Sequence, residues 1–163
     1  MPKAAVQLGM DVYPSAAQIA PLSPVREGEI ILHRDLVEER KDYFIQRNGV
    51  SYAGTHLIVD LWGAQKLDDL DHIELAMRRA VSAAGATLLH IHLHHFTPNQ
   101  GVSGVAVLAE SHISVHTWPE REFAAFDVFM CGDAEPHRTI DVLREAFRPE
   151  RIEVGEHLRG KME

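Results

Sequence analysis

Residues 101–132 read GVSGVAVLAESHISVHTWPEREFAAFDVFMCG, and this stretch decides the fold. Its apolar and β-branched runs predict three strands, at 105–110, 112–118 and 123–130. The links between these runs are only a few residues long, which is typical of strands that are antiparallel neighbours. We therefore expect three neighbouring strands of an antiparallel sheet.

The sequence on either side supplies the rest of the sheet and two helices. Asp68 and Asp69 can both cap a helix that runs to about Ala84, and Gly85 is a natural residue to end it. The remaining predicted elements are strands at 55–62, 87–96 and 151–158 and a helix from about 136 to 148. The simplest packing of this order is an α+β two-layer sandwich, a mainly antiparallel sheet with two helices packed on one face.

The first fifty residues differ from the rest of the chain. Prolines interrupt their first half, and no apolar period is sustained between them. A short helix with a ragged apolar face is predicted at 35–47. We expect residues 1–50 to be an extension or docking arm and residues 51–163 to form one folded domain.

The composition excludes several classes of function. The chain has 163 residues, enough for one domain, and 16 Lys and Arg against 24 Asp and Glu give a net charge of -8. This balance argues against a nucleic-acid groove or an anionic membrane surface as partner. No apolar run approaches the roughly 20 residues that span a bilayer, and no apolar signal core follows Met1. A single cysteine, Cys131, excludes an internal disulfide and fits a reducing compartment, so we expect a cytoplasmic protein.

Familiar cofactor sites are absent from the sequence. His90, His92 and His94 alternate along one predicted strand and could present imidazoles to zinc. No carboxylate or thiolate is placed to complete such a shell, so we expect no metal and interpret these residues as a polar sheet face. Glycine-rich phosphate loops are missing, and no lysine lies in a phosphate-binding context that pyridoxal phosphate would need.

Chemically useful side chains instead gather within about thirty residues of the opening stretch. They are Ser103, Glu110, Ser111, His112, Ser114, His116, Glu120 and Cys131. Any one of them is more often structural than catalytic. Together they supply nucleophiles, a base and a titratable thiol on neighbouring strands, but this pattern alone does not select a reaction.

Residues 109–120, AESHISVHTWPE, resemble the self-cleavage motif of the prokaryotic S-adenosylmethionine decarboxylase proenzymes, which depend on a pyruvoyl group. The resemblance covers roughly residues 54–159. It implies an inactive zymogen that cuts itself between Glu110 and Ser111. Residues 1–110 would become the β chain and residues 111–163 the α chain, with Ser111 converted to the pyruvoyl group.

The same resemblance implies roles in cleavage and catalysis. Ser111 Oγ would attack the carbonyl of Glu110, His116 would accept the proton whose loss drives elimination, and Ser103 would assist processing. Cys131 would donate the proton that the substrate's α-carbon needs after CO₂ leaves. An ordinary thiol is mostly protonated at neutral pH and is able to do so.

The implied substrate is S-adenosylmethionine, and decarboxylation would yield the aminopropyl donor for spermidine synthesis. The pyruvoyl carbonyl would form a Schiff base with the substrate amine, which explains the missing pyridoxal phosphate. Phe96 would stack on adenine and Glu120 would bind the ribose hydroxyls. Relatives pair as dimers with sites near the interface, so we expect a homodimer of processed αβ units.

Strand geometry adds an expectation to the role that the resemblance implies for His116. Ser111 and His116 are five residues apart, so a straight strand would place them on opposite faces, whereas His112, Ser114 and His116 share one face. For His116 to reach residue 111, the chain must bend. We therefore predict a strained break at residues 110–111.

Two alternatives to this function stay open. Arg121 and Glu122 stand where many relatives carry Tyr-Gly, which leaves ornithine or arginine as substrates of the same chemistry. The second alternative is an uncleaved, non-catalytic partner subunit, against which the intact Ser103, Ser111, His116 and Cys131 argue.

Overall fold

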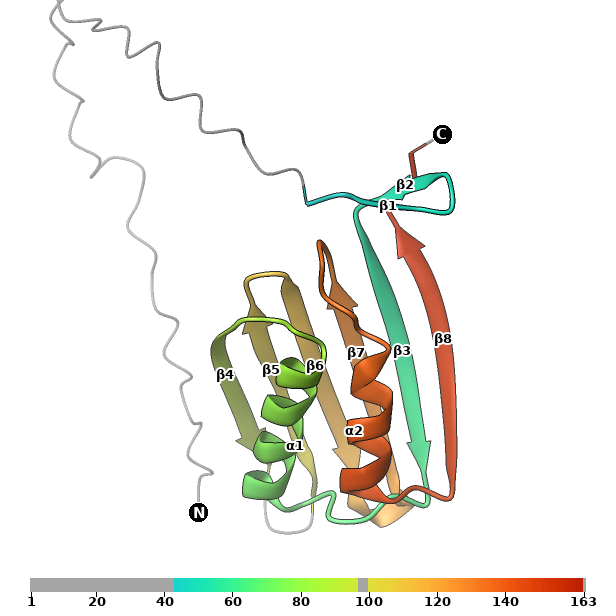
Figure 1. Cartoon of the computed structure of the whole chain (residues 1–163). Helices are drawn as coiled ribbons and strands as arrows, with labels where there is room; N and C mark the ends of the chain where they lie inside the picture. The colour runs from blue at the N-terminus through green and yellow to red at the C-terminus, as the bar shows by residue number, and fades with distance from the viewer. Residues whose placement is uncertain (1–42, 97–99, 163) are drawn as a thin grey trace, which may run out of the picture. The chain divides into compact units, whose positions relative to one another are not determined.

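The computed structural model describes residues 43–96 and 100–162. Six strands form one sheet in the order β4-β5-β6-β7-β3-β8, and every neighbouring pair is antiparallel (Figure 1). Their bounds are β3 Gly54–Trp62, β4 Leu88–His95, β5 Val102–Leu108, β6 Ser111–Trp118, β7 Phe123–Met130 and β8 Arg151–Arg159. The three strands predicted for the opening stretch are therefore neighbours in the middle of the sheet.

Helices α1 (Leu70–Ala83) and α2 (Arg138–Phe147) lie side by side on one face of this sheet (Figure 1). The carboxylate of Asp69 caps α1 by accepting a hydrogen bond from the His72 backbone N–H at 3.0 Å. Gly85, with φ +69°, follows its last turn. The predicted α+β sandwich with both helices on one face is confirmed.

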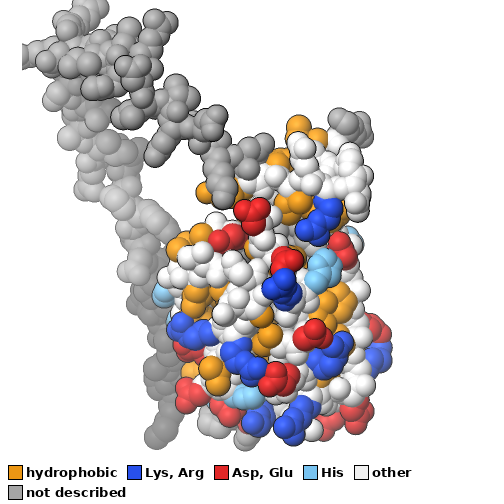
Figure 2. Space-filling view, viewed as in Figure 1, with side chains coloured by type: hydrophobic (Ala, Val, Ile, Leu, Met, Phe, Trp, Pro, Cys, Tyr) orange, Lys and Arg blue, Asp and Glu red, His pale blue; other side chains and the backbone are white. Residues whose placement is uncertain are grey.

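The hydrophobic core lies between the helices and the inward face of the sheet. Alternate residues of the strands and one stripe of each helix are buried there, among them Leu57, Ile113, Phe126, Met77 and Phe147. The outward faces of the helices carry charges of both signs (Figure 2), including the Arg78–Glu74 and Arg79–Glu145 ion pairs. No helix in the described part of the chain is long and apolar enough to cross a membrane.

The opposite face of the sheet has no helix over it among the described residues. It displays the other half of each alternating strand, including His112, Ser114 and His116 on β6. Several large apolar side chains are exposed on this uncovered face: Ile58, Trp62, Val107 and Trp118. The expectation that the three β6 side chains share a face is confirmed.

A small hairpin precedes the sheet and corrects one prediction. Strands β1 (Ile45–Arg47) and β2 (Val50–Tyr52) pair antiparallel around Asn48 and Gly49, which have φ values of +52° and +78°. The predicted helix at 35–47 is therefore wrong over residues 45–47, and residues 35–42 lie outside the described part. Positive φ at both turn residues is the geometry of a type I′ hairpin, for which Asn-Gly is the preferred pair.

Candidate active site

A tight turn at Ala109 and Glu110 joins β5 to β6, with Leu108 and Ser111 paired across it. Neither turn residue has a positive φ; the positive value, +143°, falls instead on Ser111. This is a region that residues with a Cβ rarely adopt and that favours glycine. The predicted break at 110–111 is confirmed, and the strain lies on the residue expected to be converted.

The carbonyl of Glu110 is held from the neighbouring strand. The backbone N–H of Cys131, directly after β7, donates a hydrogen bond to it at 3.0 Å. A backbone N–H aimed at a carbonyl oxygen stabilises negative charge that develops there when a nucleophile attacks the carbon. The structure thus places a hydrogen-bond donor at the bond where cleavage is expected.

The side chain of Cys131 has the protonation state that a proton donor needs. Burial raises the pKa of the Cys131 thiol, a hydrogen bond from its own backbone N–H works in the opposite direction, and the Glu110 carboxylate raises the pKa again. The net shift is upward, so the thiol is protonated at neutral pH.

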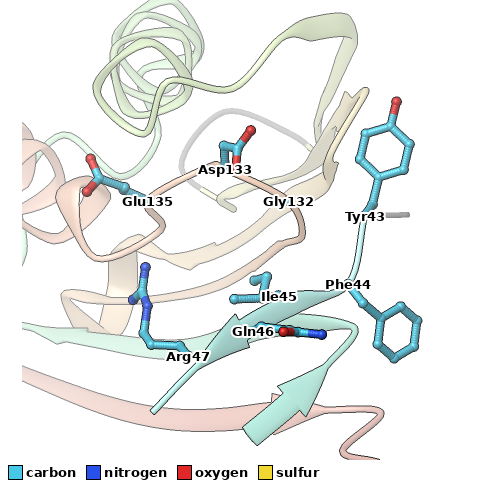
Figure 3. Close-up of a pocket in the computed structure, with 8 residues that line it drawn as sticks. All are labelled: Tyr43, Phe44, Ile45, Gln46, Arg47, Gly132, Asp133 and Glu135. Carbon is cyan, nitrogen blue, oxygen red and sulfur yellow. The ribbon is translucent and has the colours of Figure 1, made fainter. Parts of the chain in front are cut away.

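A cavity of about 310 Å³ is lined in part by Gly132, the residue that follows Cys131 (Figure 3). Residues 43–47 line one side of it, and Gly132, Asp133 and Glu135 line the other. The backbone N–H of Gly132 donates to the carbonyl of Tyr43 at 3.1 Å, which ties the two sides together. The segment before the sheet therefore borders the end of the sheet where Ser111 and Cys131 lie.

Ser103 and His116 form a second cluster, at the other end of the strands. They face each other across β5 and β6, and Ser103 Oγ lies 2.6 Å from His116 Nδ1. This is a short hydrogen bond that fixes the orientation of an exposed imidazole.

The two side chains predicted to bind substrate lie near this second cluster. Phe96 directly follows β4, is 53% exposed, and packs edge-on against His94 with ring centroids 4.9 Å apart. Glu120 is exposed in the short 3₁₀ helix η2 (Pro119–Arg121) after β6. The ring of Phe96 is largely open to solvent and is therefore not part of the hydrophobic core.

The distance between the two clusters overturns one expectation. β6 runs from Ser111 to Trp118 and pairs with β7 at every residue, so the chain does not fold back. Five residues at about 3.3 Å each separate Ser111 from His116 by roughly 16 Å along the strand. The bend at 110–111 therefore does not bring His116 to Ser111 within one chain.

The histidines of β4 do not form a metal site in this structure. His90, His92 and His94 are exposed on the uncovered face. Among residues 43–96 and 100–162, no group of three or more His, Cys, Asp or Glu side chains is arranged to hold a metal ion.

Comparison with known proteins identifies the family. A family model described as S-adenosylmethionine decarboxylase matches residues 55–160. The chain belongs to the S-adenosylmethionine decarboxylase family. The match begins at the second residue of β3, so the β1–β2 hairpin lies outside the part that the family model covers.

Individual members of the S-adenosylmethionine decarboxylase family are similar over the same region. A protein of Thermomicrobium roseum is 52% identical over 108 residues, which cover 66% of this chain and 93% of the relative. One from Methanococcus maripaludis strain C5 is 51% identical over 113 residues, covering 68% and 92%. Both carry the name S-adenosylmethionine decarboxylase proenzyme.

The fold is also similar to a solved structure of the family. The crystal structure of the adenosylmethionine decarboxylase from Aquifex aeolicus VF5 matches with a TM-score of 0.62 and 38% identity, over 69% of this chain and 94% of that one. The relatives are covered almost completely, so the sheet and helices described above correspond to nearly the whole of each relative.

Proposed function

We propose that this chain is a self-cleaving, pyruvoyl-dependent decarboxylase of S-adenosylmethionine. One observation carries the proposal: the family's Glu-Ser sequence lies in a tight turn, with φ +143° on Ser111 and the Glu110 carbonyl hydrogen-bonded by the Cys131 backbone N–H. Strain at the bond to be broken and a donor on its carbonyl oxygen both favour attack by a neighbouring hydroxyl. The names of the relatives favour S-adenosylmethionine over ornithine or arginine as substrate.

Cleavage begins with transfer of Glu110 from nitrogen to oxygen. Ser111 Oγ bonds to the Glu110 carbonyl carbon, the Glu110–Ser111 C–N bond breaks, and the Oγ proton ends on the released nitrogen. The Cys131 N–H stabilises the oxyanion of the addition step. The product is an ester in which Ser111 is no longer held to a positive φ by the peptide bond.

Elimination completes the cut. A base removes the Cα proton of Ser111, the Cβ–Oγ bond breaks, and Glu110 leaves as a carboxylate. One water molecule then hydrolyses the resulting dehydroalanine. The oxygen of the water becomes the carbonyl oxygen, the nitrogen departs as ammonia, and residue 111 becomes the pyruvoyl group. The chain needs no reagent other than water.

We infer that the base for elimination, His116, comes from a second copy of the chain. Ser111 and Cys131 lie at one end of the sheet, while Ser103 and His116 lie about 16 Å away at the other end. A two-fold axis that runs across the strands, between two uncovered sheet faces, brings opposite ends of the two copies together. Such a dimer contains two equivalent sites, each made of Ser111 and Cys131 from one copy and Ser103 and His116 from the other.

The same pairing supplies the substrate-binding side chains. Phe96 and Glu120 lie at the same end of the sheet as His116, so they would come from the second copy too. The apolar side chains of the uncovered face, Ile58, Trp62, Val107 and Trp118, would lose their exposure to water, which favours association. In the mature site the pyruvoyl carbonyl supplies the electron sink that decarboxylation of an α-amino acid needs.

Mass analysis of the purified protein tests the proposal. We expect the 18.3 kDa chain to separate under denaturing conditions into fragments 1–110 and 111–163, the second lacking a free amino terminus. Release of CO₂ from S-adenosylmethionine, but not from ornithine or arginine, would establish the substrate. A chain that stays intact with a free Ser111 hydroxyl would refute the proposed enzyme, and release of CO₂ from ornithine or arginine instead would refute the substrate.

Replacing Cys131 by alanine should separate cleavage from turnover. The variant keeps the backbone N–H that contacts the Glu110 carbonyl, so we expect cleavage at the wild-type rate. It loses the thiol, so we expect CO₂ release to fall on the order of a hundredfold, the usual contribution of one positioned proton donor. Gel analysis of cleavage and a CO₂ assay on the same sample measure both, and loss of cleavage along with activity would mean that the thiol has a different role.

The pH dependence of turnover should report the thiol. The raised pKa keeps Cys131 protonated through neutral pH, and the proton donor is lost as pH rises through that pKa. We therefore expect kcat to be sustained past the ordinary thiol value of about 8.5 and to decline above it. The residual activity of Cys131→Ala provides the control, because it should lack this decline; an identical decline in the variant would assign it to another group.

A further inference from the structure

Thr87, which no sequence motif singles out, contacts both residues of the cleavage turn. Its backbone N–H donates to Glu110 Oε2 at 2.8 Å, and its hydroxyl donates to Glu110 Oε1 at 3.1 Å. Its carbonyl accepts a hydrogen bond from the Ala109 backbone N–H at 3.0 Å. One threonine thus makes three hydrogen bonds to the two residues that precede the scissile bond.

The position of Thr87 is fixed by the end of helix α1. The backbone N–H of Ala86 donates to the Val81 carbonyl at 3.1 Å, and that of Gly85, with φ +69°, donates to the Ser82 carbonyl at 3.1 Å. These bonds close the last turn of the helix and direct the chain into β4. The position of Thr87 is therefore set by the end of helix α1 and does not adjust to the conformation of the turn.

We propose that Thr87 is a positioning residue for self-cleavage, which acts by holding the Glu110 carboxylate and thereby the orientation of the Glu110–Ser111 peptide. The proposal rests on the proposed function and adds a residue to its machinery. The carboxylate accepts two hydrogen bonds from one residue, so both the position and the rotation of Glu110 are set.

The need for such a clamp follows from the turn itself. A two-residue hairpin with no positive φ at its central residues tends to splay the strands, and here the unfavourable φ is carried by Ser111. Rotation of the 110–111 peptide would relieve the positive φ on Ser111. Thr87 holds one side of this peptide through Glu110, and the Cys131 N–H holds its carbonyl oxygen.

A double-mutant cycle tests the clamp in the full-length chain. Glu110→Ala removes both bonds to the carboxylate but keeps the peptide carbonyl, and we expect cleavage about tenfold slower, as for loss of a charge-assisted pair of bonds. Thr87→Val removes only the hydroxyl bond, for which we expect a rate about threefold lower. Thr87→Ser restores the hydroxyl and should cleave like wild type, as should Ser82→Ala, an exposed hydroxyl lost from α1.

The decisive measurement is the rate of Thr87→Val in the Glu110→Ala background. If Thr87 acts through Glu110, the second substitution adds nothing; multiplication of the two separate effects would overturn the proposal. Hydroxylamine, which cleaves esters, should not accelerate Thr87→Val, because the clamp serves the first step and no ester accumulates. It should accelerate His116→Ala, which stalls at the ester.

The outcomes also separate this proposal from the proposed function. If wild type never cleaves, the proposed function fails whatever Thr87 does. If wild type cleaves and both Glu110→Ala and Thr87→Val cleave at the same rate as wild type, only the clamp is refuted. The thermal unfolding midpoints of Ser111→Ala chains with and without Thr87→Val show whether the Thr87 substitution disturbs folding. Equal midpoints would assign the slower cleavage of Thr87→Val to lost positioning. A midpoint so low that the chain unfolds at the assay temperature would overturn that assignment.

Discussion

The Ser111→Ala chain should remain a single polypeptide of about 18 kDa and release no CO₂ from S-adenosylmethionine. Alanine has no oxygen to attack the Glu110 carbonyl and cannot become the pyruvoyl group, so neither self-cleavage nor decarboxylation can begin. We expect a complete loss of self-cleavage, measured by denaturing gel, and of CO₂ release, measured by CO₂ assay.

Two controls make this loss informative. Ser82→Ala, which removes a hydroxyl from the exposed face of α1, should cleave normally. The Ser111→Ala chain should also keep the wild-type fold by circular dichroism, because the small change leaves the core untouched. Cleavage of Ser111→Ala at the same bond would refute serine as the nucleophile.

Two inactive variants should restore one another when their chains share a dimer. Ser111→Ala lacks the nucleophile and His116→Ala lacks the base, so each homodimer is inactive. A mixed dimer has one site with Ser111 from the His116→Ala chain and His116 from the Ser111→Ala chain, and a second site that lacks both. With equal expression, half of the dimers are mixed and half of their sites are intact, so we expect about a quarter of wild-type activity.

The same experiment identifies which chain is cut. Differently tagged chains should show cleavage only of the His116→Ala chain, and only after co-expression with Ser111→Ala. Mixing Ser111→Ala with Cys131→Ala should give no comparable gain in turnover, because both missing groups belong to the same half of the site. Normal cleavage of His116→Ala on its own would mean that His116 of a second copy is not the base.

Much of the fold followed from local patterns in the sequence. The three central strands have strong apolar alternation and short links. The order of the six strands and two helices along the chain was predicted correctly, whereas the order of the strands within the sheet was not part of the prediction. The β1–β2 hairpin was missed, because the ragged apolar face at 35–47 suggested a helix. Asn48-Gly49, flanked by short extended segments, was the available signal, since this pair favours the positive φ values that the turn shows.

The sequence suggests the residues of the candidate site but not how the fold arranges them. The Glu110–Ser111 break was expected because the parity of a strand separates Ser111 from His116. The Ser103–His116 contact depends on the register of β5 with β6, which sequence spacing alone does not fix. The contact between Thr87 and Glu110 joins residues 23 apart, and an exposed threonine after a helix carries no pattern that would reveal it.

The proposed cut between Glu110 and Ser111 would have a consequence for how the protein is made. Before the cut, β5 and β6 are joined by two residues, so their pairing costs little chain entropy. Afterwards the same two strands belong to different polypeptides, and once separated they can meet again only by diffusion, at a rate that depends on concentration. If the chain is cut there, folding must come first. The cleaved protein would then depend on strand pairing that the intact precursor completed while β5 and β6 were still one chain.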